Sequence, residues 1–190
     1  TSAWTADDLR RGSYVLPIPV EVDPGDYELT LALANPQTGD LVGKPVVLGN
    51  VTIHPFSPDI ATNATWKEGI SLLGSDMREN SDSLNVTLYW QAKQPLNDSY
   101  KVFLHFQDVK THEIIAQSDS IPRAWTYPTT EWQPGEIVRD VVKIPLDSLP
   151  ESPYRVIVGL YDELSDERLP LVRPDDRAQQ DWFALTTWER

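Results

Sequence analysis

The sequence has no cysteine, no long apolar run and few positive charges. Because none of the 190 residues is cysteine, the chain can form neither a disulfide framework nor a thiolate metal site. No run of about 18 apolar residues occurs, so the sequence predicts no direct membrane insertion. The 16 Lys and Arg residues are outnumbered by 29 Asp and Glu residues, which leaves a net charge of −13. This balance argues against partners with dense negative charge, such as nucleic acid or an anionic membrane surface.

Proline and tryptophan, by contrast, are abundant, with 16 and 7 residues. Three segments alternate apolar and polar residues: 27–33 (YELTLAL), 84–92 (LNVTLYWQA) and 101–108 (KVFLHFQD). A period of two is typical of half-buried strands. Turn residues separate such segments at the short intervals of an antiparallel sandwich. The sequence therefore predicts an all-β fold, an antiparallel β-sandwich of immunoglobulin-like or jelly-roll-like type.

Part of the sequence occurs twice. Residues 4–19 (WTADDLRRGSYVLPIP) match residues 132–145 (WQPGEIVRDVVKIP), and residues 24–41 match residues 151–169. Predicted strands and a long loop precede the second copy, whereas the first copy follows almost at once on residue 1. An internal repeat of this kind indicates two units of one architecture.

The repeat predicts a division of the chain. We expect residues 1–54 to be the second half of a β-sandwich repeat, either truncated or packing on the next unit, and residues 55–190 to be a complete unit. An oligomer that completes the N-terminal unit is an alternative. Since the chain opens inside a motif and without an N-terminal signal, we expect residue 1 to be a processing or cloning boundary.

Both copies carry a tryptophan that is followed seven residues later by an arginine. Trp4 precedes Arg11, and Trp132 precedes Arg139. A pair that recurs in both copies is typical of the fold rather than of a ligand site. We therefore predict that each tryptophan is buried and that its arginine stacks on it or caps it.

Five segments carry a resemblance to a known module: LNVTLYWQA, KVFLHFQD, IIAQSDS, YPTTEWQPGEIVRD and YRVIVGLYDELSDERLP. Together they resemble the β-sandwich module at the C-terminus of bacterial multi-pass membrane proteins of the glycosyltransferase (protein-mannosyltransferase-like) type. The resemblance covers residues 57–190, and the second half of the module again in residues 1–54. It implies an extracytoplasmic accessory domain, in the cell envelope or secreted, whose partners are other domains of the same larger protein. The membrane-embedded catalytic residues of such enzymes have no counterpart in this sequence.

Motifs for catalysis or metal binding are scarce. There is no G-x-S-x-G elbow, and His54, His105 and His112 follow no metal-binding spacing. The 29 carboxylates would allow a glycoside-hydrolase pair, but nothing in the sequence singles one out. We expect no catalytic residue, no metal and no cofactor. Calcium at the acidic segments 162–167 and 175–176 is the alternative to solvated turns.

Residues 121–136 (IPRAWTYPTTEWQPGE) form the largest irregular stretch and the best candidate for a ligand site. Arg123, Trp125 and Tyr127 lie together in it, and His105 lies on the opposite face of its strand from the apolar residues. Flat aromatic rings beside hydrogen-bonding groups suit sugar rings, so these four residues are the predicted ligand-binding set. The alternative is structural, with the rings covering one end of the sandwich and His105 hydrogen-bonded inside it.

These observations predict a non-catalytic extracytoplasmic module that serves as an accessory or interaction domain of a larger cell-envelope protein. A carbohydrate-binding module that uses residues 121–136 and takes glycans as partners is the alternative function. A glycoside hydrolase is the third.

Overall fold

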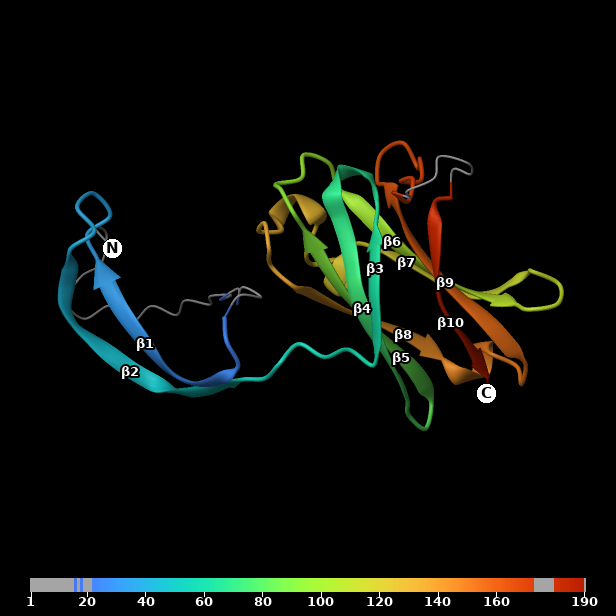
Figure 1. Cartoon of the computed structure of the whole chain (residues 1–190), viewed down its shortest axis with the longest axis horizontal. Helices are drawn as coiled ribbons and strands as arrows, with labels where there is room; N and C mark the ends of the chain where they lie inside the picture. Colours follow the sequence, from blue (N-terminus) through green and yellow to red (C-terminus); the bar gives the residue numbers. More distant parts are fainter. Residues whose placement is uncertain (1–15, 17, 19–21, 173–179, 190) are drawn as a thin grey trace.

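The computed structural model describes residues 16, 18, 22–172 and 180–189. Its strands form three antiparallel sheets, two of four strands and one of two strands (Figure 1). The two larger sheets pack face to face as a β-sandwich, and the small sheet is a hairpin near the N-terminus. The prediction of an all-β antiparallel fold is therefore confirmed.

Each sheet of the sandwich combines strands from distant parts of the chain. The first sheet has the order β3–β4–β5–β8, with β3 (Ile60–Thr65), β4 (Ile70–Glu79), β5 (Ser83–Ala92) and β8 (Val138–Pro145). The second sheet has the order β10–β9–β6–β7, with β6 (Tyr100–Asp108), β7 (Ile114–Ser120), β9 (Pro153–Asp162) and β10 (Trp182–Glu189). Residues 121–136 therefore lead from β7 in one sheet to β8 in the other.

Short helical turns interrupt the connections between the strands. They are η1 (Lys67–Gly69), α1 (Pro122–Trp125), η2 (Thr129–Glu131) and η3 (Leu146–Ser148). Among the described residues, no helix has the length and apolar character needed to cross a membrane.

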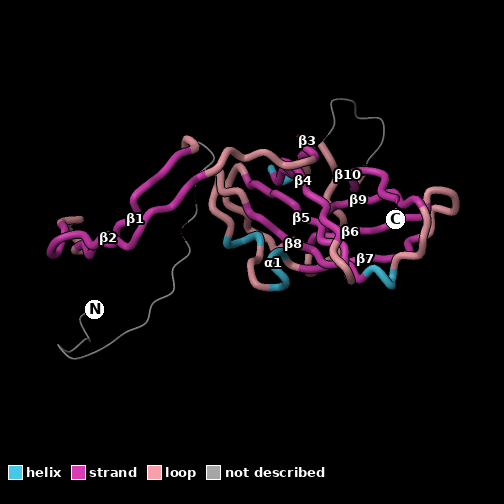
Figure 2. Tube along the Cα trace, turned by 90° about the horizontal axis from the view of Figure 1, so that it is seen from below, coloured by secondary structure: helices cyan, strands magenta, loops and turns pink. Residues whose placement is uncertain are grey.

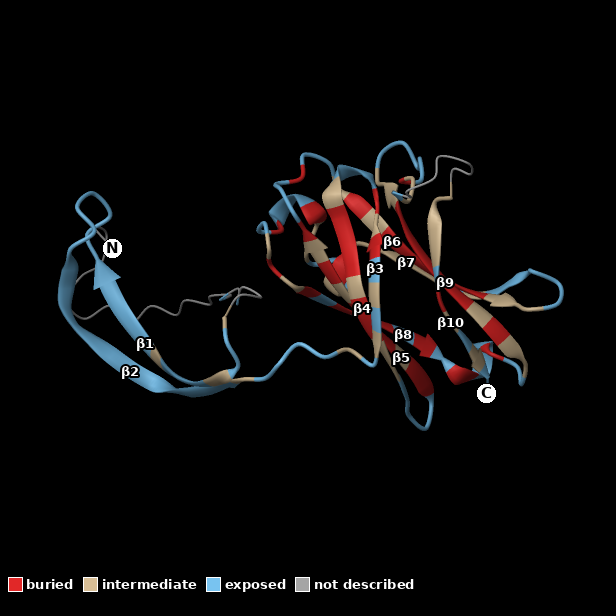
Figure 3. Cartoon of the chain, in the orientation of Figure 1, coloured by how far each residue is buried: buried red, intermediate tan, exposed pale blue. Residues whose placement is uncertain are grey.

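The hydrophobic core lies between the two four-stranded sheets (Figure 3). Residues of β8 are alternately buried and exposed from Val138 to Pro145, as expected for a strand with one face on the core. Trp66 and Trp90 are fully buried, with ring centres 5.5 Å apart. Since each large apolar side chain contributes about 1.5–3 kcal/mol when it is buried, this layer is the main source of stability.

The outward face of the second sheet is also partly covered. Phe103 and His105 point away from the core, yet only 1% and 5% of their surface is exposed. Phe103 pairs with Gly159 in the register of β6 and β9, and the absence of a side chain on Gly159 leaves room for the phenyl ring. The Arg168 guanidinium lies over the same ring, 4.4 Å from its centre.

The N-terminal hairpin consists of β1 (Gly25–Ala34) and β2 (Leu41–Ile53), and almost all of it is exposed. Apolar and polar residues alternate in β1 as they do in strands of the sandwich, but Leu31 and Leu33 are 50% and 54% exposed. Residues 54–58 link it to β3 without regular structure (Figure 2). Within the described ranges, no strand of the hairpin pairs with a strand of the sandwich.

Gly159→Ala is expected to destabilise the sandwich. A Cβ at this position would lie 2.3 Å from Phe103 Cζ and 2.6 Å from the carbonyl oxygen of Asp181, so both must shift. Overpacking of this kind costs about 1–3 kcal/mol, which urea denaturation would detect as a lower midpoint. As a control, Thr187→Val changes an exposed residue of β10 and should alter the free energy of unfolding by less than about 0.5 kcal/mol. An unchanged midpoint in the Gly159 variant would contradict this packing.

Candidate functional site

The segment that leads from β7 to β8 begins with a left-handed turn. Arg123, Ala124 and Trp125 have φ angles of 55°, 52° and 70°. Left-handed backbone costs a residue with a side chain roughly 1–2 kcal/mol, so three in a row require compensation from their surroundings. The turn leaves the Trp125 side chain 57% exposed. Strained backbone that presents an aromatic ring to solvent is typical of functional positions.

A buried carboxylate secures this turn. The Arg123 N–H donates to Asp140 Oδ1 at 2.7 Å, and the Trp125 N–H donates to the Ile121 carbonyl at 2.9 Å. Asp140 lies on β8 and is 1% exposed. Burial raises the pKa of Asp140 above its ordinary value, although the hydrogen bond from the Arg123 N–H and the Arg123 charge act in the opposite direction. The carboxylate thus caps the turn, because an N–H in the first turn of a helix has no backbone partner of its own.

A second buried carboxylate lies beneath the loop. Glu136 Oε2 accepts a hydrogen bond from the Tyr127 hydroxyl at 2.9 Å and from the Gln133 N–H at 3.2 Å. Glu136 Oε1 lies 3.6 Å from Arg123 Nη2, and the Arg123 guanidinium lies 4.4 Å from the centre of the Tyr127 ring. Burial, with the hydrogen bond to Glu136, raises the pKa of Tyr127 to about 12. Arg123 and Tyr127 therefore support the loop from within.

The structure corrects the predicted pairing of Trp132 with Arg139. Trp132 is buried as expected, and its indole N–H donates to the Tyr127 carbonyl at 3.4 Å. Arg139, however, is exposed, because it follows buried Val138 in β8 and successive side chains of a strand point to opposite faces. The prediction that Arg139 covers Trp132 is wrong. Their counterparts, Trp4 and Arg11, lie outside the described residues.

Trp125 belongs instead to a group on the outward face of β6 and β9. Lys101 Nζ lies 5.5 Å from the centre of the Trp125 ring and 5.7 Å from the centre of the Tyr161 ring. Lys101 and Tyr161 are direct cross-strand partners. We call Lys101, Trp125 and Tyr161 the aromatic face. Two aromatic rings that contact the same cation provide surface to which a polar, ring-shaped ligand can bind.

A charged hollow of about 230 Å³ adjoins the aromatic face. It is lined by Phe103, Asp119, Tyr161, Asp166 and Arg168. Its position beside Tyr161 supplies hydrogen-bonding groups of both charges next to the aromatic rings.

His105 lies beside this hollow rather than in it. Its Nε2 is 3.6 Å from Asp119 Oδ2, and its ring centre is 4.9 Å from that of Phe103. Neither ring nitrogen has a hydrogen-bond partner among the described residues. Burial lowers the pKa of His105 below its ordinary value of 6.5; Asp119 opposes this shift, and Arg168 adds to it. The predicted ligand-binding set is therefore divided: Trp125 is exposed, Arg123 and Tyr127 are partly exposed, and His105 is buried.

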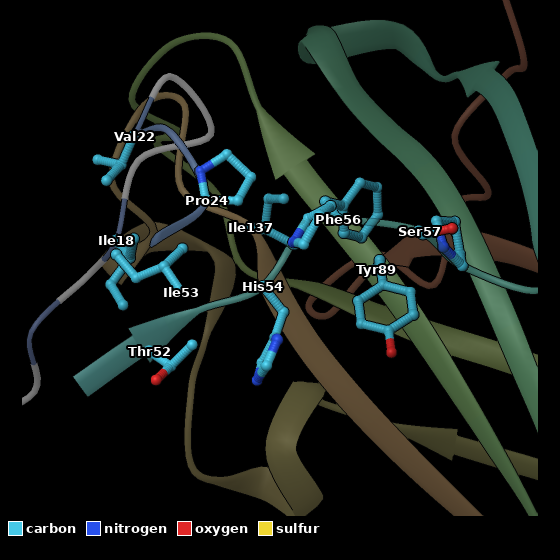
Figure 4. Close-up of a pocket in the computed structure, with 12 residues that line it drawn as sticks. Ile18, Val22, Pro24, Thr52, Ile53, His54, Phe56, Ser57, Tyr89 and Ile137 are labelled. Carbon is cyan, nitrogen blue, oxygen red and sulfur yellow. The ribbon is translucent and has the colours of Figure 1, made fainter. Parts of the chain in front are cut away.

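A larger hollow, of about 710 Å³, lies where the linker meets the first sheet (Figure 4). His54, Phe56 and residues of β2 line one side, and Tyr89 and Ile137 of the sandwich line the other. The Phe56 and Tyr89 rings meet edge to face, with centres 5.2 Å apart. None of the lining residues is a carboxylate, Lys or Arg, so this hollow offers packing surface and few polar groups.

The acidic segment 162–167 forms a closed hairpin turn. Asp162 Oδ1 accepts hydrogen bonds from the N–H groups of Leu164 and Ser165 and from the Ser165 hydroxyl. Residues 175–176 lie outside the described residues. Within the ranges that the structure describes, no three His, Asp or Glu side chains are grouped so that they could hold a metal ion.

Sequence reasoning missed Lys101, Asp119, Tyr161 and Arg168. A signal for two of them was available, because Lys101 alternates in phase with Phe103 and His105, and Tyr161 is out of phase with the core-facing residues Val156, Val158 and Leu160 of β9. The contributions of Asp119 and Arg168 depend on strand register and on the path of the segment after β9. No spacing in the sequence reports either of these.

In comparisons with known proteins, no family model matches the chain, and no curated protein is significantly similar to it.

Asp140→Ala should release the left-handed turn. The Arg123 N–H would lose its acceptor, which costs about 1–3 kcal/mol in a partly buried site. Asp140→Asn keeps an acceptor oxygen and should retain most of the stability. Chemical denaturation measures the cost, and the nuclear magnetic resonance signal of the Trp125 indole N–H reports whether the turn is still ordered. Equal losses in the two variants would contradict the assigned hydrogen bond.

The stability of the sandwich should fall as the pH decreases through the range below about 6.5. Because the pKa of His105 is lower in the folded state, the unfolded chain binds this proton more readily. The stabilising contribution is complete above the unfolded pKa and is lost progressively as the pH falls toward the folded pKa. The pKa values of Asp76, Asp108 and Asp162 are lowered from 3.8, so these groups do not titrate in this range. Burial raises the pKa of Asp140 in the folded state, so protonation of this carboxyl as the pH falls acts against the loss from His105.

Urea midpoints between about pH 8 and about pH 5.5 measure this dependence. His105→Gln should flatten the slope, whereas His112→Gln, at an exposed position in the β6–β7 turn, should leave it intact. An undiminished slope in His105→Gln would overturn the assignment.

Proposed function

We propose that this chain is a non-catalytic β-sandwich module that binds carbohydrate on the aromatic face. One observation carries the proposal: Trp125 is 57% exposed and is held by a turn of three left-handed residues, Arg123 to Trp125. The exposed tryptophan ring leaves apolar surface in water, which costs hydrophobic free energy. The left-handed backbone that presents the ring costs conformational energy. A ligand that covers the ring would offset the first cost and account for the second.

The chemistry of the surface suits a sugar. The apolar C–H face of a pyranose can rest on Trp125 or Tyr161, whose ring centres lie 5.5 Å and 5.7 Å from Lys101 Nζ. Sugar hydroxyls both donate and accept hydrogen bonds. Asp119 can accept them and Arg168 can donate them from the adjoining hollow.

A binding role fits this face better than hydrolysis does. The hollow of about 230 Å³ is smaller than the roughly 300–1,000 Å³ of pockets that enclose a ligand. One of its carboxylates, Asp119, already faces His105 at 3.6 Å. An open face with paired charges favours a glycan chain lying across the sheet over a substrate enclosed for bond cleavage.

The resemblance in the sequence supplies the setting that we propose. The module would be an extracytoplasmic accessory domain of a larger bacterial cell-envelope protein, with other domains of that protein as partners. A face that holds a glycan would keep such a protein close to its carbohydrate substrate or to the cell wall. Neither role requires a cofactor.

Trp125→Ala should abolish most of the binding to the glycan that the parent protein selects from a glycan array. Loss of a tryptophan at the centre of a binding surface costs about 2 kcal/mol or more, which is about a 30-fold loss of affinity in calorimetric titration. Tyr161→Ala should have a similar effect. Phe56→Ala is the matched control, because Phe56 is an exposed aromatic residue of the linker and its loss should leave affinity unchanged.

Two outcomes would contradict the proposal. The parent protein could bind no glycan at all, or the Trp125 and Tyr161 variants could bind as tightly as the parent.

A further inference from the structure

The hairpin β1–β2 has the same strand register as the hairpin β9–β10. Tyr27 pairs with Val51 in one, and Tyr154 pairs with Trp188 in the other. Both ladders then contain an irregularity at the same place. The register shifts after Leu29 in β1, and it shifts after Val156, the equivalent residue, in β9. A β-bulge is a specific feature of a fold, so its recurrence at one position indicates a common design.

Side-chain hydrogen bonds repeat as well. The Tyr27 hydroxyl donates to the carbonyl of Asp23, four residues earlier, and the Tyr154 hydroxyl donates to the carbonyl of Pro150, again four residues earlier. The strand then ends in the same turn in both hairpins. Asn35 Oδ1 accepts from the N–H groups of the residues two and three positions later, and so does Asp162 Oδ1.

The two hairpins differ in what covers them. In β9, the inward residues are all buried in the core: Tyr154, Val156, Val158 and Leu160. Their equivalents in β1 form what we call the open apolar face: Tyr27, Leu29, Leu31 and Leu33. Among these, Tyr27 is 38% exposed, Leu31 50% and Leu33 54%. A contiguous apolar face on a two-stranded sheet is unfavourable in water, because such hairpins are at best marginally stable alone.

One edge of the hairpin is open too. In the sandwich, β9 pairs with β10 on one edge and with β6 on the other. In the described part of the chain, β1 pairs with β2 alone. Among the described residues, the second edge of β1, which we call its free edge, therefore has no partner for its backbone N–H and C=O groups, whereas its equivalent holds β6.

We propose that β1–β2 is the closing hairpin of a second sandwich, and that the open apolar face and the free edge of β1 receive the remaining strands of that sandwich from polypeptide ahead of residue 1. Two observations identify this occupant. In the described unit, strands β3 to β8 cover β9–β10, and they precede β9 in the chain. The sequence repeat adds that residues 4–19 match the segment that contains β8.

A second copy of the chain is a poorer fit to this surface. Its strands β3 to β8 already hold its own β9–β10, so they offer no vacant position for a hairpin. The inference is independent of carbohydrate binding, since the aromatic face belongs entirely to the described sandwich.

The test compares the 190-residue chain with the full-length protein that contains it, using amide hydrogen exchange. In the full-length protein, amides of β1 should exchange at least about tenfold more slowly, because their free edge is paired and their apolar face is covered. Leu31→Asp in the full-length protein should remove this protection and leave exchange in β5 and β8 unchanged. Thr30→Asp, on the opposite face of β1, is the matched control and should retain the protection.

Each alternative outcome overturns the proposal. Equal exchange in the two proteins, or a full-length protein with too few preceding residues for the equivalents of β3 to β7, would exclude this occupant. Protection of β1 that appears in the 190-residue chain with rising concentration, together with a dimer in sedimentation, would assign the face to a second copy.

Discussion

The hydrogen bond from the Arg123 N–H to the buried Asp140 carboxylate links the core of the sandwich to its most unusual surface. Asp140 lies on β8, whose alternate residues pack between the sheets. By accepting this hydrogen bond at 2.7 Å, it holds a left-handed turn that no local sequence preference would form. The position of Trp125 thus depends on burial of a charged group some distance along the chain. One hydrogen bond thus connects the buried face of β8 to the position of Trp125 at the surface.

The two hairpins show how little of a strand pair's stability resides in the pair itself. β1–β2 and β9–β10 share their register, their bulge and the tyrosine hydrogen bond. Within the ranges that the structure describes, β9–β10 has β6 beside it and an opposing sheet against its inward face, and β1–β2 has neither. Apolar burial contributes roughly 25 cal/mol per Å². The two hairpins therefore differ in how much of their apolar surface neighbouring strands bury. The sequence of each hairpin specifies its register and its bulge, and burial against neighbouring strands stabilises it.

Much of the fold follows from the sequence, because a period of two identifies strands and the residues that share one face of each. Segments 84–92 and 101–108 lie in β5 and β6 as their alternation predicts. Less of the candidate site could be predicted from the sequence. Trp125 could be predicted from its aromatic neighbours, but Lys101 and Tyr161 meet it only through strand register. Arg139 was assigned to Trp132 by spacing alone, whereas strand geometry turns it to solvent. Buried Glu136 and Asp140 could not be foreseen, since an acidic residue in sequence carries no sign of burial.

We propose that a ligand binds this molecule on the aromatic face. Nuclear magnetic resonance titration of the labelled chain with the oligosaccharide selected on a glycan array tests this proposal most directly. Saturable shifts are expected only at the Trp125 indole N–H and at the backbone amides around Lys101 and Tyr161. Shifts centred on Phe56 and Tyr89, in the larger hollow by the linker, would contradict it, and so would the absence of any saturable shift.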